Sequence, residues 1–449
     1  MARRRHKPVP KEPVQAVIDK MDHEGRGITY HDGRTVFVDG ALPKEEVVFQ
    51  YVSRRAKVAE ARTLEVIQGS AERVDAKCPH FYLCGGCSLQ HMAPEAQINF
   101  KQNVLLEQLE HFGNVQPEDV LPPLVNKEPW AYRRRARLGA RYVHKKEKVL
   151  VGFREKHSSF LADLSSCKVL TANVGENLEE FKTLFSSLAA KETIPQIEVA
   201  VGDEQTALII RHLEPLSDDD LKILIGFCQR LDFELYLQPK GPQTIHRVYP
   251  DPVPGIIPGQ ERLSYRLPDF NLEFKFHVSD FTQVNGGINR QMVPFAIDLL
   301  APSKDDKVLD LFCGLGNFTL PIATRAKEVV GVEGSERMVE RGYENAKLNN
   351  LENARFYAAD LSQQGQQAPW YDEQYDLILL DPARSGADVL VSNIERFGAR
   401  RIVYVSCNPA TLSRDAGILV EKGYRLKKAG VMDMFPHTAH VESIALFEK

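Results

Sequence analysis

The stretch "VLDLFCGLGNFTL", Val308–Leu320, decides the fold. Its first residues form an apolar run typical of a buried strand, and its last residues have the spacing of a helix. Between them, Gly314 and Gly316 let a ligand approach the backbone at the start of that helix. A strand, a glycine-rich loop and a helix in this order predict a site for a nucleotide-like cofactor.

Apolar strands that alternate with helices continue from this stretch to the C-terminus. They read "KVLDLF", "EVVGVE", "ARFYAAD", "YDLILLD" and "RIVYVS". Such strands with helical crossovers predict a doubly wound parallel sheet, a Rossmann-like α/β domain over 276–449. Glu333, Asp360 and Asp381 end three of these strands, at the carboxyl edge where such sheets bind ligands. We expect Glu333 to bind ribose hydroxyls and Asp360 to bind an adenine amino group. The loop and the downstream Asp-Pro resemble those of S-adenosylmethionine (SAM) methyltransferases more than a GxGxxG dinucleotide motif.

Cys407 follows the last of those strands, in "IVYVSCNPATLSRD". A free cysteine is often only a small core residue. Here its thiol, a few per cent thiolate at neutral pH if its pKa is ordinary, would face the cofactor as a nucleophile. Addition of a thiolate to carbon 6 of uracil activates carbon 5 for methylation, and a base must then remove the carbon-5 proton. Glu442 is the candidate base, with His437 and His440 as alternatives, unless Glu442 is only an exposed residue of an edge strand.

Three cysteines lie close together in "CPHFYLCGGC", and a fourth lies in "LSSCKVL". They are Cys78, Cys84, Cys87 and Cys167. An odd total of seven cysteines in a chain expected in the reducing cytoplasm favours metal ligands or a reactive thiol over disulfides. The spacing is compatible with zinc, with an iron–sulfur cluster or with no metal, and His80 and His91 keep a mixed zinc site open.

The segment "YRRRARLGARYVHKKEKVLVGFREK" is rich in Lys and Arg and has interleaved aromatic residues. A run of charges is usually a solvated surface, but the whole chain carries a net charge of −4, so this basic segment stands out. Phosphate contacts and base stacking use these residue types. The sequence predicts RNA or DNA binding, with the contacts assigned to Arg133, Arg134, Arg135 and Arg137.

The rest of the 449 residues divides by composition and pattern. A basic tail over 1–11 precedes short β-like segments over 12–70, which predict an OB-like barrel. An α+β middle domain over 71–275 contains an amphipathic helix over 94–112. No apolar run reaches the roughly 18 residues of a membrane helix. We therefore expect a cytoplasmic protein without membrane contacts, and a monomer.

The chain resembles the RNA 5-methyluridine methyltransferase family over its whole length. The motifs that carry the resemblance are "CPHFYLCGGC", "YRRRARL", "DFTQVNGGIN", "LDLFCGLGNFTLP", "LLDPAR", "YVSCNPATLSRD" and "DMFPHTAHVES". The segment "HEGRGITYHDGRTVFVDGALPKEEV" resembles the TRAM domain, an RNA-binding barrel, except that Lys44 replaces a common glycine.

The resemblance implies a function and a set of site residues. Cys407 would be the nucleophile, Glu442 the base, and the four cysteines the ligands of a 4Fe-4S cluster. SAM contacts would be Gln283, Phe312, Asn317, Glu333, Asp360 and Asp381. Within the family, a barrel combined with the cysteines indicates 23S ribosomal RNA as substrate, and the helix over 94–112 packs on the catalytic domain. Alternatives are a uridine of another rRNA or a tRNA, cytosine-C5 methylation, or an RNA-binding iron–sulfur protein without activity.

Overall fold

The structure is a computed structural model that describes residues 9–251, 260–363, 365 and 368–449. Most of the predicted basic tail, residues 1–8, therefore lies outside the described residues. The chain forms two compact units. The first contains residues up to Lys101, Gly152–Leu164 and Phe435–His440, and the second contains Gln102–Val151, Ser165–Met434 and Val441–Lys449. No described helix is both long enough and apolar enough to cross a membrane.

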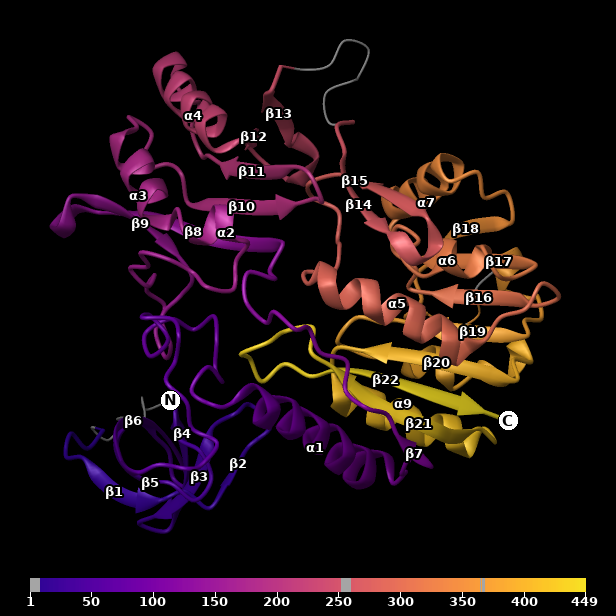
Figure 1. The fold of residues 1–449 in the computed structure, drawn as a ribbon, viewed down its shortest axis with the longest axis horizontal. Helices are drawn as coiled ribbons and strands as arrows, with labels where there is room; N and C mark the ends of the chain where they lie inside the picture. Colours follow the sequence, from indigo (N-terminus) through magenta and orange to yellow (C-terminus); the bar gives the residue numbers. More distant parts are fainter. Residues whose placement is uncertain (1–8, 252–259, 364, 366–367) are drawn as a thin grey trace, which may run out of the picture. The chain divides into compact units, whose positions relative to one another are not determined.

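The first unit is built on a six-stranded sheet with the order β1-β5-β6-β4-β3-β2 (Figure 1). Its strands are β1 (Val14–Val17), β2 (Lys20–Met21), β3 (Gly27–His31), β4 (Arg34–Asp39), β5 (Glu46–Arg54) and β6 (Val58–Gln68). The hairpin β3–β4 turns at Asp32-Gly33, as the sequence predicts, and both residues have positive φ, at 52° and 68°. Alternate side chains from the strands pack into one core that includes Val36, Phe49 and Ala61, so the sheet curls around its own interior.

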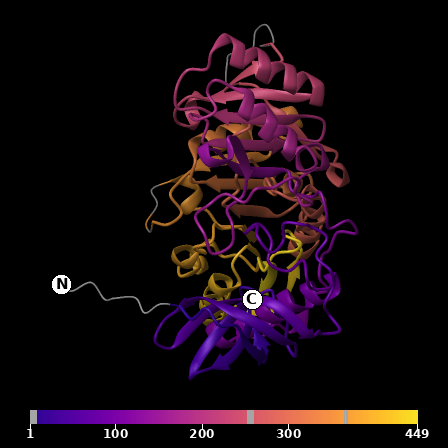
Figure 2. The ribbon, with the colours of Figure 1, turned by 90° about the vertical axis from the view of Figure 1, so that its left-hand side faces the viewer.

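The second unit contains a six-stranded sheet over the middle of the chain, in the order β13-β12-β11-β10-β8-β9. The strands are β8 (Arg135–Val143), β9 (Lys148–Gly152), β10 (Gln196–Val201), β11 (Thr206–Arg211), β12 (Phe233–Gln238) and β13 (His246–Tyr249). The helices of this region are α2 (Ala172–Gly175), α3 (Leu178–Ser187) and α4 (Asp218–Leu231). Helices α3 and α4 pack together on one side of the sheet (Figures 1 and 2), and α4 contacts β12 and β13.

The second unit also contains an eight-stranded sheet in the order β18-β17-β16-β19-β20-β22-β21-β7. Its strands are β7 (Asp119–Val120), β16 (Lys307–Leu311), β17 (Glu328–Glu333), β18 (Ala354–Ala358), β19 (Leu377–Leu380), β20 (Arg401–Ser406), β21 (Arg425–Met432) and β22 (Glu442–Glu448). Strands β16 to β20 are parallel, and β22 is antiparallel to both of its neighbours. The mixed α/β fold that the sequence predicts is confirmed, and all five predicted parallel strands are present. The strand order reverses at β16, between β17 and β19, and this is where open α/β sheets bind ligands.

Helices cover this sheet and connect its strands. They are α5 (Gly286–Leu300), α6 (Thr319–Ala323), α7 (Glu336–Leu348), α8 (Asp388–Val391) and α9 (Pro409–Glu421). Helix α5 packs on β19, β20 and β22 (Figure 1), and a hairpin of β14 (Leu263–Leu267) and β15 (Leu272–Phe276) precedes it. The predicted helix over 94–112 is α1 (Pro94–Gly113), whose last residue approaches α9 so closely that a Cβ on Gly113 would lie 2.4 Å from the Ser413 carbonyl oxygen.

Candidate active site

The glycine-rich loop after β16 adopts a backbone that few residue types allow. Phe312, Gly314 and Gly316 all have positive φ, at 66°, 55° and 95°. Glycine adopts such angles without cost, but a non-glycine residue such as Phe312 is strained there, and strained residues gather at ligand sites. The amide of Gly314 donates to the Glu333 carboxylate at 3.1 Å, so the loop lies directly beside the acid that ends β17.

The two acids assigned to nucleoside binding both follow strands at the same edge. Glu333 accepts a second backbone hydrogen bond from Ser335 at 3.1 Å, which fixes its carboxylate at the start of α7. Asp360, just after β18, accepts from the hydroxyl and amide of Ser362 and from the Gln363 amide group. These hydrogen bonds lower the pKa of Asp360, so its carboxylate stays ionised and is able to accept from an amino group.

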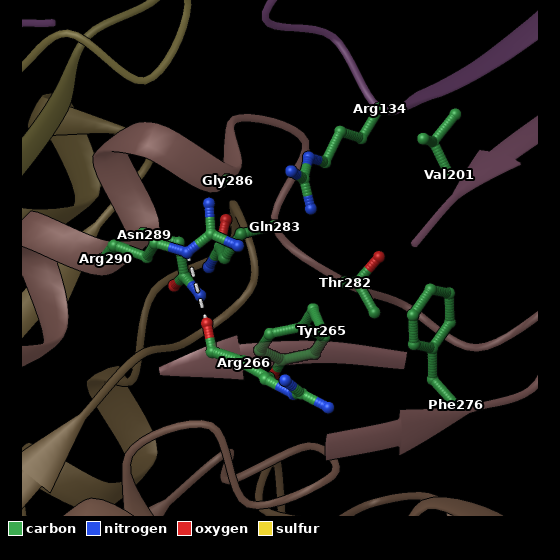
Figure 3. Close-up of a pocket in the computed structure, with 10 residues that line it drawn as sticks. All are labelled: Arg134, Val201, Tyr265, Arg266, Phe276, Thr282, Gln283, Gly286, Asn289 and Arg290. Carbon is green, nitrogen blue, oxygen red and sulfur yellow. Dashed lines mark hydrogen bonds between the residues drawn. The ribbon is translucent and has the colours of Figure 1, made fainter. Parts of the chain in front are cut away.

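The side-chain amides of Asn317 and Asn289, which are far apart in the sequence, lie together at the same end of the sheet. Asn317 exchanges hydrogen bonds of 2.9 and 3.1 Å with Asn289 of α5, and it also accepts from the Tyr265 hydroxyl at 2.8 Å. Asn289 and Tyr265 line a pocket together with Gln283 and Arg290 (Figure 3). The cofactor candidates Gln283 and Asn317 are thus linked through shared neighbours.

Arginines from three parts of the chain meet at this pocket. Asp203, in the turn between β10 and β11, pairs with Arg134 at 2.5 Å and with Arg290 at 2.7 Å, and it accepts from the backbone amide of Arg266. Arg290 also donates to the Arg266 carbonyl oxygen at 3.2 Å, the dashed line of Figure 3. Asp203 therefore joins the middle sheet to the hairpin and helix that carry part of the pocket.

Cys407 and Glu442 are neighbours across two antiparallel strands. In the register of β20 and β22, Ser406 is opposite Ser443, so the next residues outward are Cys407 and Glu442. The Glu442 side chain is buried and the Cys407 side chain is partly exposed. Strand β22 lies between β20 and β21, so the alternative of an exposed residue on an edge strand is wrong for Glu442.

Burial sets the charge state of this pair. Burial, followed by the nearby charges of Glu442 and Asp381, raises the pKa of the Cys407 thiol to about 11, against the opposing effect of Arg384. Burial, followed by the charge of Asp381, raises the pKa of Glu442 well above its usual range, and burial raises that of Asp381 to about 7. A pKa near 11 leaves only about one thiol in 10⁴ ionised at pH 7, compared with a few per cent for a thiol of ordinary pKa.

The turn after Cys407 is held by a second loop that the sequence reasoning did not assign. Asn408 caps α9, and its amide group donates to the carbonyl oxygen of Arg384 at 2.9 Å. Thr411 donates to the same oxygen at 3.3 Å. Arg384 lies three residues after Asp381 in "DPAR". Its position just after an acid at a strand end was the sequence feature that could have assigned it to the site.

The arginines predicted to bind RNA have different environments. Arg134 pairs with Asp203, as above, and the largely buried Arg135 donates to the carbonyl oxygen of Asp280. Arg133 donates to the Arg135 carbonyl oxygen at 3.0 Å. Arg137 has a side chain that is 70% exposed, although it pairs with Glu198 at 3.0 Å. Of this set, Arg137 is the residue most available to a ligand.

The four cysteines predicted to bind a cluster are partly exposed, and none of them forms a disulfide with a described residue. Cys78, Cys84 and Cys87 lie in consecutive turns of the first unit, where the Gly86 amide donates to the Cys84 sulfur at 3.4 Å. Such N–H···S hydrogen bonds suit a thiolate that binds a metal. Cys167 belongs to the second unit. Within the described ranges, no three His, Cys, Asp or Glu side chains are gathered so as to hold a metal ion.

The alternative bases His437 and His440 belong to the first unit, unlike Glu442. The backbone amide of His437 donates to the Gln97 side chain at 2.9 Å, and its ring lies 3.5 Å from the same amide group. His440 is exposed and its ring packs edge-on against Phe435.

The sequence and the structure are similar to those of known RNA methyltransferases. A family model described as tRNA (Uracil-5-)-methyltransferase matches residues 260–449. The 23S rRNA (uracil(1939)-C(5))-methyltransferase RlmD of Alcanivorax borkumensis is 55% identical, over 100% of this chain and 99% of its own length. The enzyme of the same name from Hahella chejuensis is 52% identical, over 99% of each chain. The structure of Pyrococcus abyssi tRNA (uracil-54, C5)-methyltransferase in complex with S-adenosyl-L-homocysteine matches with a TM-score of 0.72 and 26% identity, over 96% of this chain and 99% of that chain.

Proposed function

Because the chain belongs to the family of SAM-dependent RNA uracil-C5-methyltransferases, we propose that it methylates carbon 5 of uridine 1939 in 23S rRNA, the base in the names of its relatives. One observation carries this proposal. The register of β20 and β22 brings Cys407 and Glu442 to adjacent positions, at the edge of the sheet where the glycine-rich loop begins. A nucleophile and a base side by side are what methylation of an unreactive carbon requires.

The described residues fit SAM as the methyl donor. The carboxylate of Glu333 lies against the backbone of the glycine-rich loop, and Asp360 stays ionised where an adenine amino group would be bound. Gln283, Phe312, Asn317 and Asp381 complete the proposed set around the same end of the sheet. When bound, SAM supplies a methyl group on a sulfonium cation, whose positive charge favours the ionised forms of nearby carboxyl groups.

Cys407 and Glu442 then perform the steps that belong to the protein. The Cys407 sulfur forms a bond to carbon 6 of uracil as its proton leaves to a neighbouring carboxylate, and the electrons of the carbon 5–carbon 6 bond move towards carbon 5 and oxygen 4. Carbon 5 takes the methyl group. The ionised Glu442 removes the carbon-5 proton, the double bond re-forms and the bond between sulfur and carbon 6 breaks. The net change is a methyl group in place of one proton.

The burial of the Cys407 thiol protects it before the reaction begins. Since the thiol is neutral at pH 7, it is protected from adventitious alkylation and oxidation until substrate binds, because the thiolate is the reactive form. A uridine flipped out of its RNA helix would bring the acceptor carbon to the sulfur. Arg384, whose positive charge lowers the pKa of both Cys407 and Glu442, assists ionisation of the two groups.

The remaining parts support RNA recognition in this proposal. The six-stranded sheet of the first unit acts as a TRAM barrel that binds RNA. Cys78, Cys84, Cys87 and Cys167 would hold a structural 4Fe-4S cluster, for which the N–H···S hydrogen bond to Cys84 is the supporting observation. The protein would work as a monomer in the cytoplasm.

The experiment is methylation of a 23S rRNA transcript with SAM labelled in its methyl group, followed by mass spectrometry of the digested RNA. We expect 5-methyluridine at position 1939 and none in the product of Cys407→Ala. Transcripts of tRNA and a 23S rRNA with cytidine at that position serve as competing substrates. Methylation of either of these in preference to the uridine transcript would overturn the substrate assignment, and SAM binding without any methylation would indicate an inactive RNA-binding protein.

A further inference from the structure

The side of the middle sheet that carries Gln196, Arg211 and Gln238 contains a groove of about 350 Å³, a volume within the range of small-ligand pockets. Side chains from neighbouring strands line it because they share one face of the sheet. Gln196 of β10 is opposite Arg211 of β11, which in turn is opposite Gln238 of β12. The other lining residues that matter here are Arg135, Arg137, Glu198, Lys240, Ser279 and Arg337.

The groove is strongly positive although the chain as a whole is not. Among the described residues, Glu198 is the only carboxylate that lines it, and this group already accepts hydrogen bonds from Arg137 and Gln196. Arg337 lines the groove, but its guanidinium group is 3.3 Å from the buried carboxylate of Asp280, a residue that does not line the groove. In the described part of the chain, neither Arg211 nor Lys240 has a carboxylate partner, so their charges are available to an anion.

The groove also contains a buried hydrogen-bond acceptor, the side-chain amide oxygen of Gln238. Gln238 is 7% exposed, and its amide nitrogen donates to the Lys240 carbonyl oxygen at 3.2 Å. Its amide oxygen has no hydrogen-bond partner among the described residues. A buried acceptor left unpaired costs free energy, so a ligand that offers an N–H or O–H donor at this point gains more than an ordinary surface contact would give. The groove therefore combines an anion site with a hydrogen-bond acceptor.

We propose that this groove binds one nucleotide of the RNA substrate next to the target base, with the phosphate at Arg211 and Lys240 and a base or ribose donor at Gln238. The inference rests on the proposed function. The position of the groove supports a nucleotide close to the target. Ser279 and Gln283 belong to the single loop between β15 and α5, and four residues span at most about 14 Å of chain. A remote RNA-binding surface would not share a loop with the cofactor site.

The test compares two double variants in equilibrium filter binding of a 23S rRNA transcript at several salt concentrations. One variant is Arg211→Ala with Lys240→Ala. The matched control is Lys222→Ala with Arg230→Ala, which removes two exposed cations of α4, away from the groove. Each lost phosphate contact reduces the slope of log affinity against log salt by roughly 0.7–0.9. Because both cations contact the same phosphate, the groove variant should lose about 0.7–0.9 from that slope and bind roughly 5- to 8-fold more weakly at 0.1 M salt.

A third variant, Gln238→Leu, separates the hydrogen bond from the charge. It should weaken RNA binding roughly 3- to 10-fold and leave the salt slope unchanged, because a neutral group releases no counterion. Circular dichroism and SAM affinity of all variants should equal those of the wild type. If the wild type binds and methylates the transcript but the groove variants match the control, the inference is wrong and the proposed function stands. If the wild type itself neither binds nor methylates the transcript, the proposed function fails first.

Discussion

The Cys407 thiol should be unusually resistant to alkylation in the absence of substrate. Burial and two neighbouring carboxyl groups raise its pKa to about 11, against an ordinary value of 9.0. At pH 7.5 the thiolate fraction is then about 3 × 10⁻⁴, whereas a thiol of ordinary pKa would be about 3% ionised. Since the thiolate is the species that reacts, alkylation should be about 100-fold slower than for such a thiol.

The assay is iodoacetamide labelling from pH 7.0 to 9.5, with the peptide that contains Cys407 quantified by mass spectrometry and Cys407→Ser as the blank. The rate should rise about tenfold per pH unit over the whole range, since all of it lies below the pKa. Glu442→Gln removes a negative charge near the thiol and should raise the rate at pH 9.5. Asp381→Asn should raise it less, because its charge has the smaller effect on the Cys407 pKa. A rate that levels off below pH 9 would refute this account of the site.

Further predictions concern backbone strain, the arginine pocket and the metal. Lys44 has a φ of 68°, so Lys44→Gly should relieve strain and raise the free energy of unfolding by about 1 kcal/mol. The control Lys57→Gly, at an exposed residue of ordinary φ, should not raise it, and urea titration measures both. Asp203→Asn should lower the unfolding free energy by about 1–3 kcal/mol at pH 7. Its salt bridges lower the Asp203 pKa, so the difference from wild type should shrink as the pH falls below 3.8, and an equal difference at pH 3 would contradict this. Protein purified anaerobically should contain about four irons per chain, and stoichiometric zinc without iron would exclude the cluster.

The elements that position the site follow from local sequence signals. The strands from Lys307 to Ser406 are continuous apolar runs, and each acid at a strand end is visible because the run stops there. The turn at Asp32-Gly33 is equally local, since both of its residues tolerate positive φ. The pairing of β20 with β22 joins segments more than thirty residues apart, so no local pattern in the sequence indicates it.

The sequence alone did not predict properties that depend on packing in three dimensions, such as side-chain pKa values and the pairing of charged residues. The pKa of Cys407 is raised by burial and by the charges of Glu442 and Asp381. These three residues lie at the ends of three different strands, β20, β22 and β19. The basic segment predicted RNA contacts for neighbouring arginines alike, yet Arg134 is bound by Asp203 and Arg137 is exposed. Alternation along β8 does not distinguish them, because the carboxylates that decide their roles lie on β10 and in the following turn.

The central claim, a covalent path through Cys407 with Glu442 as the base, is tested most directly by Glu442→Gln. This change preserves size and hydrogen bonding but removes the basic oxygen, and loss of a general base costs roughly 10²–10⁴-fold in rate. With labelled SAM and the 23S rRNA transcript, the variant should accumulate a methyl-labelled protein–RNA complex that survives denaturing electrophoresis, while Cys407→Ala forms none. Turnover by Glu442→Gln at the wild-type rate, with no trapped complex, would contradict the account.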